Sequence, residues 1–191
     1  MSVLTWRLRH LASAPPPTQS GKTLSTATQV QQAPPPRIPI LVGGCGSGRT
    51  SLLGRLQEVL GPETEYVDVE RIATTPERFL SSVMHATRCQ APEMPPGTAD
   101  TRATRAAFDR VCHFLEHART TNGTRVTFLL DEALEIRTFE SFPGLRGVLR
   151  EFWLTLCDSP NRFVLTTRFV TRTIRLFRDA PERFELVHLP P

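Results

Sequence analysis

The chain has 191 residues, of which 39% are hydrophobic, and this length and composition suit one domain with a buried core. Its positive formal charge of +4 arises before the first acidic residue, Glu58, so the rest of the chain lacks the single-sign field typical of nucleic-acid binding. Cys45, Cys89, Cys112 and Cys157 have neither metal-ligand nor disulfide spacing, and no apolar run reaches the ~18 residues of a membrane span, which together predict a cytoplasmic protein.

Residues 1–36 are predicted to form a disordered leader. Two triple-proline runs flank a stretch rich in Ser, Thr and Gln that has no hydrophobic period. The remaining residues, 37–191, alternate apolar runs with helical patterns, as expected of one α/β domain.

Five short apolar runs predict a parallel sheet, and the amphipathic segments between them predict helices on both of its faces. The helix after the first strand is expected to end at Gly61, and Thr75-Pro76-Glu77 supplies an N-cap, an N1 proline and a first-turn acid for the next helix. The strongest helical period runs over residues 145–156. The predicted strands are 38–42, 66–69, 126–130, 163–166 and 185–189, and the predicted helices are 52–60, 75–84, 101–119, 145–156 and 169–177.

A glycine-rich loop joins the first strand to its helix, and it follows the pattern G-x-x-x-x-G-K-[ST] except at one position. Glycines let successive main-chain N–H groups curl around phosphate oxygens at a helix N-terminus, while the lysine reaches the β- and γ-phosphates and the hydroxyl reaches magnesium. The strand before the loop and the helix after it supply the context that the motif needs. The predicted nucleotide-binding residues are Gly43, Gly44, Cys45, Gly46, Ser47, Gly48, Arg49, Thr50 and Ser51, with Thr50 also as a magnesium ligand.

Arg49 occupies the lysine position of this motif. Its guanidinium keeps the positive charge but is larger and planar, so nucleotide binding is expected to survive better than catalysis. A general preference for arginine explains the exchange equally well, because the chain has a single lysine, Lys22. That lysine lies in Gly21-Lys22-Thr23, which resembles the end of the motif, but this segment belongs to the leader and follows no predicted strand.

Asp131 and Glu132 follow directly after the predicted strand 126–130. Ligands collect beyond the carboxyl ends of parallel strands, so this acidic pair is expected to face the glycine-rich loop. Asp131 is predicted to help hold magnesium, and Glu132 is predicted to orient or deprotonate an attacking water molecule.

With these motifs the chain resembles the P-loop ATPases of the AAA+ and STAND kind, a group that includes origin-recognition and transposition ATPases. The resemblance covers residues 37–191 and rests on residues 43–51, 129–132 and 163–168. It implies a three-layer P-loop NTPase sandwich, in which a parallel five-stranded sheet of order 5-1-4-3-2 carries helices on both faces. It also implies ATP and Mg²⁺ as cofactors, and Arg168 as a sensor of the γ-phosphate at the end of the fourth strand.

The same resemblance implies that a neighbouring copy in a homo-oligomer supplies an arginine finger, for which Arg178 and Arg183 are the candidates. These families place a helical lid after the fifth strand, so a chain that ends at Pro191 is expected to be truncated before the lid. No residue indicates a client, whether protein or DNA.

Two functions therefore stay open. The first is an ATPase domain that binds Mg·ATP and hydrolyses it slowly as a switch or motor, with Arg49, Glu132 and Arg168 as catalytic residues. The second is a non-hydrolysing nucleotide-binding or scaffold module, which Arg49 and the missing lid favour. ATP is expected rather than GTP because the Asn-Lys-x-Asp signature of GTPases needs a lysine, and residues 37–191 contain none.

Overall fold

The computed structural model describes residues 36–93, 103–177 and 183–190. Within these ranges the chain forms a five-stranded sheet in the order β2-β3-β4-β1-β5, and every pair of neighbouring strands is parallel. The order is the predicted one, counted from the opposite edge, so the α/β fold class is confirmed. The strands are β1 (Ile38–Val42), β2 (Thr64–Asp68), β3 (Thr127–Asp131), β4 (Arg162–Thr167) and β5 (Phe184–His188).

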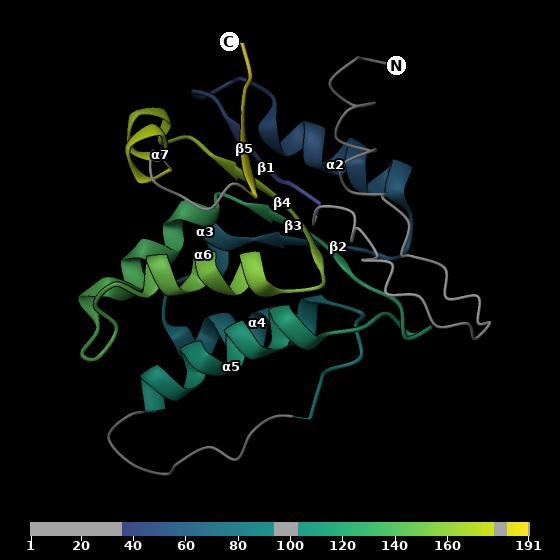
Figure 1. Ribbon diagram of the computed structural model, residues 1–191, viewed down its shortest axis with the longest axis vertical. Coiled ribbons are helices and arrows are strands. Elements are labelled where there is room, and N and C mark those ends of the chain that lie inside the picture. The colour runs from purple at the N-terminus through teal and green to yellow at the C-terminus, as the bar shows by residue number, and fades with distance from the viewer. Residues whose placement is uncertain (1–35, 94–102, 178–182, 191) are drawn as a thin grey trace, which may run out of the picture.

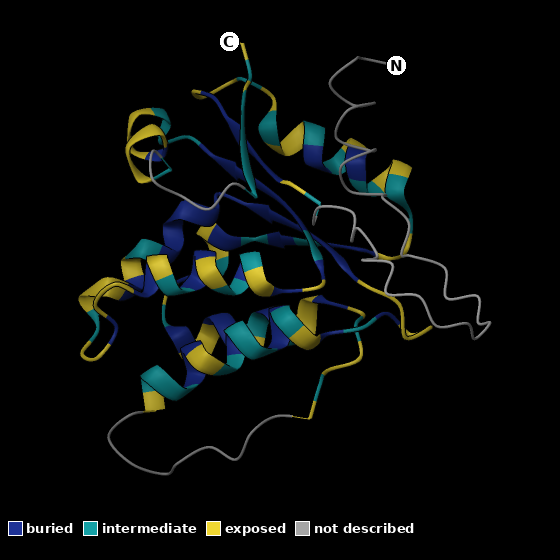
Figure 2. Cartoon of the chain, viewed as in Figure 1, coloured by how far each residue is buried: buried dark blue, intermediate teal, exposed yellow. Residues whose placement is uncertain are grey.

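The three inner strands are buried on both faces, as expected of apolar runs in a parallel sheet. They form the dark blue band through the middle of Figure 2. The edge strands β2 and β5 each contain residues of intermediate burial. Because all strands run in one direction, their carboxyl ends meet at one edge of the sheet, where the candidate site lies.

Helix α2 (Arg49–Leu60) covers one face of the sheet, and the other long helices cover the opposite face (Figure 1). On the α2 side, Leu53 and Leu56 pack against strand residues that include Leu41, Leu129 and Val164. The larger core on the opposite face contains buried phenylalanines from helices and strands. Those helices are α4 (Pro76–Ala86), α5 (Ala103–His117) and α6 (Val148–Asp158), and the short α7 (Val170–Leu176) precedes β5.

The N-cap of α4 is the predicted one: the Thr75 hydroxyl accepts a hydrogen bond from the N–H of Arg78 at 3.2 Å, and Pro76 stands at the first helical position. Several other boundaries differ from the prediction by a few residues, and for two of them the structure shows the cause. Strand β2 ends at Asp68, because the Asp68 carboxylate accepts the N–H of Arg71 and caps a short helix, α3 (Val69–Ile72). Helix α6 starts at Val148, after Gly147 in a left-handed conformation.

A 3-10 helix, η1 (Ala133–Ser141), follows β3 and was not predicted. It packs against α3, α6 and β4 and buries Leu134, Ile136 and Phe139. The predicted leader falls on residues 1–36, of which 1–35 lie outside the described residues. Among the helices that the structure describes, none has the length and apolar character that crossing a bilayer demands.

Candidate nucleotide-binding site

The glycine-rich loop turns the chain from β1 into α2 at the carboxyl edge of the sheet. Gly43 must be glycine, because an added Cβ atom would lie 2.5 Å from the Ser47 hydroxyl oxygen. Gly46 and Gly48 have φ values of 81° and 74°, which L-residues with side chains rarely adopt. The sequence thus places its glycines where this turn requires them.

Most main-chain N–H groups of this loop have no hydrogen-bond partner among the described residues, and these include the N–H groups of Cys45, Gly46, Gly48, Arg49 and Thr50. The last two open helix α2, whose first-turn N–H groups have no carbonyl to pair with and carry the positive end of the helix dipole. Loop amides at a helix N-terminus are suited to bind an anion such as a phosphate group.

Arg49 folds back over this loop. Its Nη1 donates to the carbonyl oxygens of Gly43 and Gly44 and, at 3.1 Å, to the Ser47 hydroxyl. Its Nη2 forms an ion pair with Glu132 Oε1 at 2.8 Å. The two side chains are only 11% and 9% exposed, so a largely buried cation links the loop to the acidic residue at the end of β3.

Asp131, at the end of β3, is buried and accepts three hydroxyl donors. Thr50 Oγ1 and Tyr66 Oη donate to Oδ2 at 2.7 and 2.8 Å, and Thr166 Oγ1 donates to Oδ1. The donors come from α2, β2 and β4, so three elements hold one carboxylate. A hydroxyl and a carboxylate in contact are oxygen ligands of the kind that Mg²⁺ prefers, so this pair fits the implied ion.

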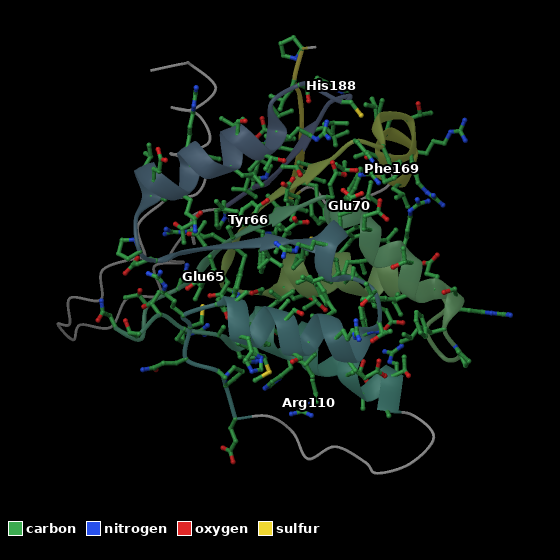
Figure 3. All side chains as sticks on the ribbon, turned by 180° about the vertical axis from the view of Figure 1, so that it is seen from behind. Glu65, Tyr66, Glu70, Arg110, Phe169 and His188 are labelled. Carbon is green, nitrogen blue, oxygen red and sulfur yellow. The ribbon has the colours of Figure 1, made fainter. Side chains whose placement is uncertain are left out.

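Tyr66 was not predicted as a site residue. Burial, and then the hydrogen bond to Asp131, raise the pKa of its phenol well above the usual range, so the hydroxyl stays protonated and remains a donor. Figure 3 shows Tyr66 on β2, next to Glu65. Its side chain lies on the same side of the sheet as that of Asp131, because Tyr66 pairs with Leu129, two residues before Asp131.

Glu132 has φ 53° and is the one non-glycine residue with positive φ in the described part of the chain. Its N–H donates to Thr166 Oγ1 at 2.9 Å, which fixes the main chain in this conformation. Its carboxylate bridges two elements: Oε1 accepts Arg49 Nη2, and Oε2 accepts the N–H of Arg168 at 3.0 Å. A residue held in an unfavourable backbone conformation beside an anion-binding loop is typical of a functional position.

Arg168 follows β4, at the strand end where the sequence places it, and its N–H donates to Glu132, but its side chain points to other carboxylates. Its guanidinium pairs with Glu70 Oε1 at 2.7 Å and Glu135 Oε1 at 2.8 Å, and it lies 4.9 Å from the ring centre of Phe169. Glu70 and Phe169 are labelled in Figure 3. The hydrogen bond to Glu70 raises the pKa of Arg168. Neither Glu70 nor Glu135 was predicted, because nothing in the sequence shows that α3 and η1 converge on this arginine.

The structure places one of the two predicted finger residues. Arg183 precedes β5 at the amino edge of the sheet, where its side chain donates to the carbonyl oxygens of Pro36 (3.3 Å) and Ser159 (3.4 Å). This edge is opposite to the glycine-rich loop, so Arg183 does not contact the site of its own chain. Arg178 lies outside the described residues.

No protein-family model matches the chain, and no curated protein matches it. Among solved structures it is similar to the ORC2 protein of Aeropyrum pernix in ADPNP–ADP complexes, with 18% identity over 81% of this chain and 41% of that chain and a TM-score of 0.49. A Walker-type ATPase of Pyrococcus abyssi is 17% identical over 79% of this chain and 48% of that chain, with a TM-score of 0.48. Drosophila ORC bound to DNA is 17% identical over 80% of this chain and 37% of that chain, with a TM-score of 0.44. The chain spans less than half of each of these chains, and similarities of this strength do not establish its family.

Proposed function

We propose that this chain is an ATP-binding domain of the AAA+ or STAND kind that binds Mg·ATP and hydrolyses it slowly. The observation that carries this proposal is the 2.7 Å hydrogen bond between Thr50 and Asp131, two residues 81 positions apart. It brings the hydroxyl of the glycine-rich loop and the carboxylate of β3 together beside loop amides that have no partner among the described residues. A glycine-rich turn that binds no ligand would not require a hydroxyl, a carboxylate and free loop amides at one place.

Each residue then has a task. The loop amides bind phosphate oxygens, and Thr50 and Asp131 hold the magnesium ion, which would neutralise phosphate charge. Glu132 orients or deprotonates water, and Arg168 senses the γ-phosphate, for which its side chain must leave Glu70 and Glu135. Tyr66 and Thr166 position Asp131 through their hydrogen bonds.

A second candidate, a non-hydrolysing nucleotide-binding module, is favoured by the contacts of Glu132. Both of its carboxylate oxygens are occupied, one by Arg49 and one by the N–H of Arg168. These two contacts occupy part of the acceptor capacity of the carboxylate and leave less of it open to a water molecule. Hydrolysis is therefore favoured if phosphate draws Arg49 away from Glu132, whereas nucleotide binding alone does not need that movement.

Calorimetric titration of the full chain with ATP, in magnesium and then in EDTA, tests the proposal. Thr50→Ala removes the hydroxyl that contacts Asp131, and Thr50→Ser keeps it. We expect saturable binding by the unaltered chain and by Thr50→Ser in magnesium, and about tenfold weaker binding by Thr50→Ala, since that variant loses a charge-assisted hydrogen bond and a metal ligand.

Lys22→Ala is the control for Gly21-Lys22-Thr23, the segment that resembles the end of the phosphate-binding motif. This variant is expected to bind ATP like the unaltered chain. The proposal fails if the unaltered chain does not bind ATP. It also fails if Thr50→Ala binds ATP in magnesium as tightly as Thr50→Ser.

A further inference from the structure

Strand β2 is an edge strand whose outer side has main-chain groups without a partner. The N–H of Thr127 donates to the carbonyl of Glu63 at 3.0 Å, so alternate residues of β2 face β3, and Thr64 and Tyr66 direct their main-chain groups outward. The outward N–H of Thr64 is satisfied by the Gly61 carbonyl at 3.2 Å. The Thr64 carbonyl and both main-chain groups of Tyr66 have no hydrogen-bond partner among the described residues.

Two cavities of about 480 and 340 Å³ lie along this outer side and share Tyr66 and Ala86 as lining residues. We call them together the edge groove. Helix α4 lines it through residues that include Arg78 and Ala86, and the end of α2 lines it through Gln57. The groove therefore gives access from solvent to the main-chain groups of β2 that lack a partner.

The edge groove carries positive charge. Arg71, Arg78 and Arg88 line it, are exposed, and form no ion pair within the described part of the chain. Two carboxylates also line the groove, and each is bonded to a main-chain N–H rather than to a guanidinium: Asp68 accepts the N–H of Arg71 at 3.0 Å, and Glu65 accepts the N–H of Arg88 at 2.9 Å, so three arginines and two carboxylates leave a net charge of +1. Three guanidinium groups are thus available to an incoming ligand.

We propose that the edge groove binds an extended, acidic peptide segment of another protein, which adds to β2 as a further strand. Main-chain groups of the peptide pair with Thr64 and Tyr66, and its carboxylates pair with the arginines. Strand β2 has five residues, which sets the paired segment at about five residues and ~16 Å. This surface is separate from the glycine-rich loop and does not depend on the proposed ATPase activity.

Three other occupants suit the groove less well. A nucleic-acid backbone offers acceptors to the arginines but no regular donors for the carbonyls of Thr64 and Tyr66. A second copy paired edge to edge would bring the three arginines against their own copies, and like charges repel. The leader of this chain has no acidic residue, since the first one is Glu58.

The probe is the fluorescein-labelled peptide Glu-Val-Glu-Val-Glu, titrated with the full chain at low ionic strength and followed by fluorescence anisotropy. Three kinds of comparison ligand are used: the basic peptide Lys-Val-Lys-Val-Lys, two N-methylated forms of the acidic peptide, and a single-stranded oligothymidylate. The two N-methylated forms carry methyl groups on alternate amides, one form on the odd-numbered amides and the other on the even-numbered ones. The variant Arg71→Glu/Arg78→Glu reverses the charge of the groove. The matched control Arg172→Glu/Arg175→Glu changes two exposed arginines on α7, outside the groove.

We expect the acidic peptide to bind, the lysine peptide not to bind, and one N-methylated form to bind about tenfold more weakly, because it cannot pair with the strand. We expect Arg71→Glu/Arg78→Glu to weaken binding about tenfold or more and the α7 control to bind like the unaltered chain, with thermal unfolding showing that both fold. Equal binding by both double variants, or by all N-methylated forms, would overturn the proposal. So would stronger binding of oligothymidylate than of the acidic peptide.

Discussion

Arg49 is the residue at which this site departs from its motif, and its contacts show what the exchange does. A guanidinium has donors on two sides of a rigid plane, and Arg49 uses one nitrogen for the loop carbonyls of Gly43 and Gly44 and the other for Glu132. An ammonium is a compact point charge that cannot span both partners in this way. Arginine therefore stabilises a state in which the loop is bonded to Glu132.

We expect Arg49→Lys to increase ATP hydrolysis by about tenfold, because releasing one charge-assisted contact to Glu132 is worth about that factor. Phosphate release under saturating ATP measures the rate. Arg55→Lys, an exposed exchange on α2, is the matched control and should leave the rate unchanged. A lower rate in Arg49→Lys than in the unaltered chain would show that the guanidinium itself takes part in hydrolysis.

Glu132→Gln separates the two candidate functions. The amide cannot accept the proton of water, so we expect hydrolysis to fall by about 100-fold or more while ATP binding is retained. Phosphate release and calorimetric titration measure the two quantities on the same sample. A hydrolysis rate equal to that of the unaltered chain would remove Glu132 from the mechanism.

Cys45 reports on the loop. It is exposed, whereas burial raises the pKa values of the Cys89 and Cys112 thiols to about 12. Only the thiolate reacts, and at pH 8 a thiol with such a pKa is ionised to about one part in ten thousand, so alkylation of these two should be slow and should rise as the pH is raised toward 12.

We therefore expect iodoacetamide at pH 8 to label Cys45 first, and Mg·ATP to protect it, as peptide mass spectrometry will show. AMP with magnesium, which lacks the β- and γ-phosphates, is the control and should protect poorly. Equal labelling of Cys45 with and without Mg·ATP would place the nucleotide away from the loop.

At the level of elements, the strands were predictable because inner strands of a parallel sheet are apolar on both faces, and 38–42, 126–130 and 163–166 have that composition. Helix α3 and the 3-10 helix η1 could not be predicted from the sequence, because each depends on tertiary contacts. The sequence around Asp68 gives no sign that β2 ends there. The strand ends because the Asp68 carboxylate accepts the N–H of Arg71 and so caps helix α3. In η1, buried Ile136 and Phe139 are three residues apart, which is too short a pattern to identify a 3-10 helix.

The site was predictable where its residues follow strands in sequence, which covers the glycine-rich loop, Asp131 and Glu132. It was not predictable where its contacts depend on how distant segments pack. Tyr66 reaches Asp131 because β2 and β3 align Asp68 with Asp131, and one sequence does not reveal that register. The partners of Arg168 on α3 and η1 were missed for the same reason.

Asn161 joins three elements at the amino edge of the sheet. Its amide donates to the carbonyls of Leu115, Glu116 and Ala118 at the end of α5, and its oxygen accepts the N–H of Val126 before β3 at 3.1 Å. The residue is fully buried, so no water replaces these bonds.

We expect Asn161→Ala to lower the free energy of unfolding by about 3 kcal/mol, because it leaves buried main-chain groups without partners. For a chain of this size, that corresponds to a fall in melting temperature of about 6–12 °C. Differential scanning calorimetry measures it, with Asn122→Ala in the exposed turn as control. A fall below about 2 °C would show that the amide contributes little to joining these elements.

For the whole molecule, the proposed arginine finger predicts activity that depends on assembly. Arg178→Ala subunits are expected to hydrolyse ATP slowly alone, and so are Glu132→Gln subunits. A mixture places an intact arginine beside an intact Glu132 at some interfaces, so its phosphate release should exceed the mean of the two separate samples. In the control mixture, Arg146→Ala, which changes an exposed arginine ahead of α6, replaces Arg178→Ala. Its phosphate release should equal the mean of the two separate samples. No gain at any mixing ratio would contradict a shared site.

Tyr66 belongs to two sites at once, since the residue lines the edge groove and its hydroxyl donates to Asp131. A ligand that shifts this residue at one place changes the free energy of the other. Thermodynamic linkage requires the effect to be reciprocal: if magnesium nucleotide changes the affinity of the groove by some factor, then a strand in the groove changes the affinity for magnesium nucleotide by the same factor. A single phenol would then set how strongly a partner protein and a nucleotide influence each other on this domain.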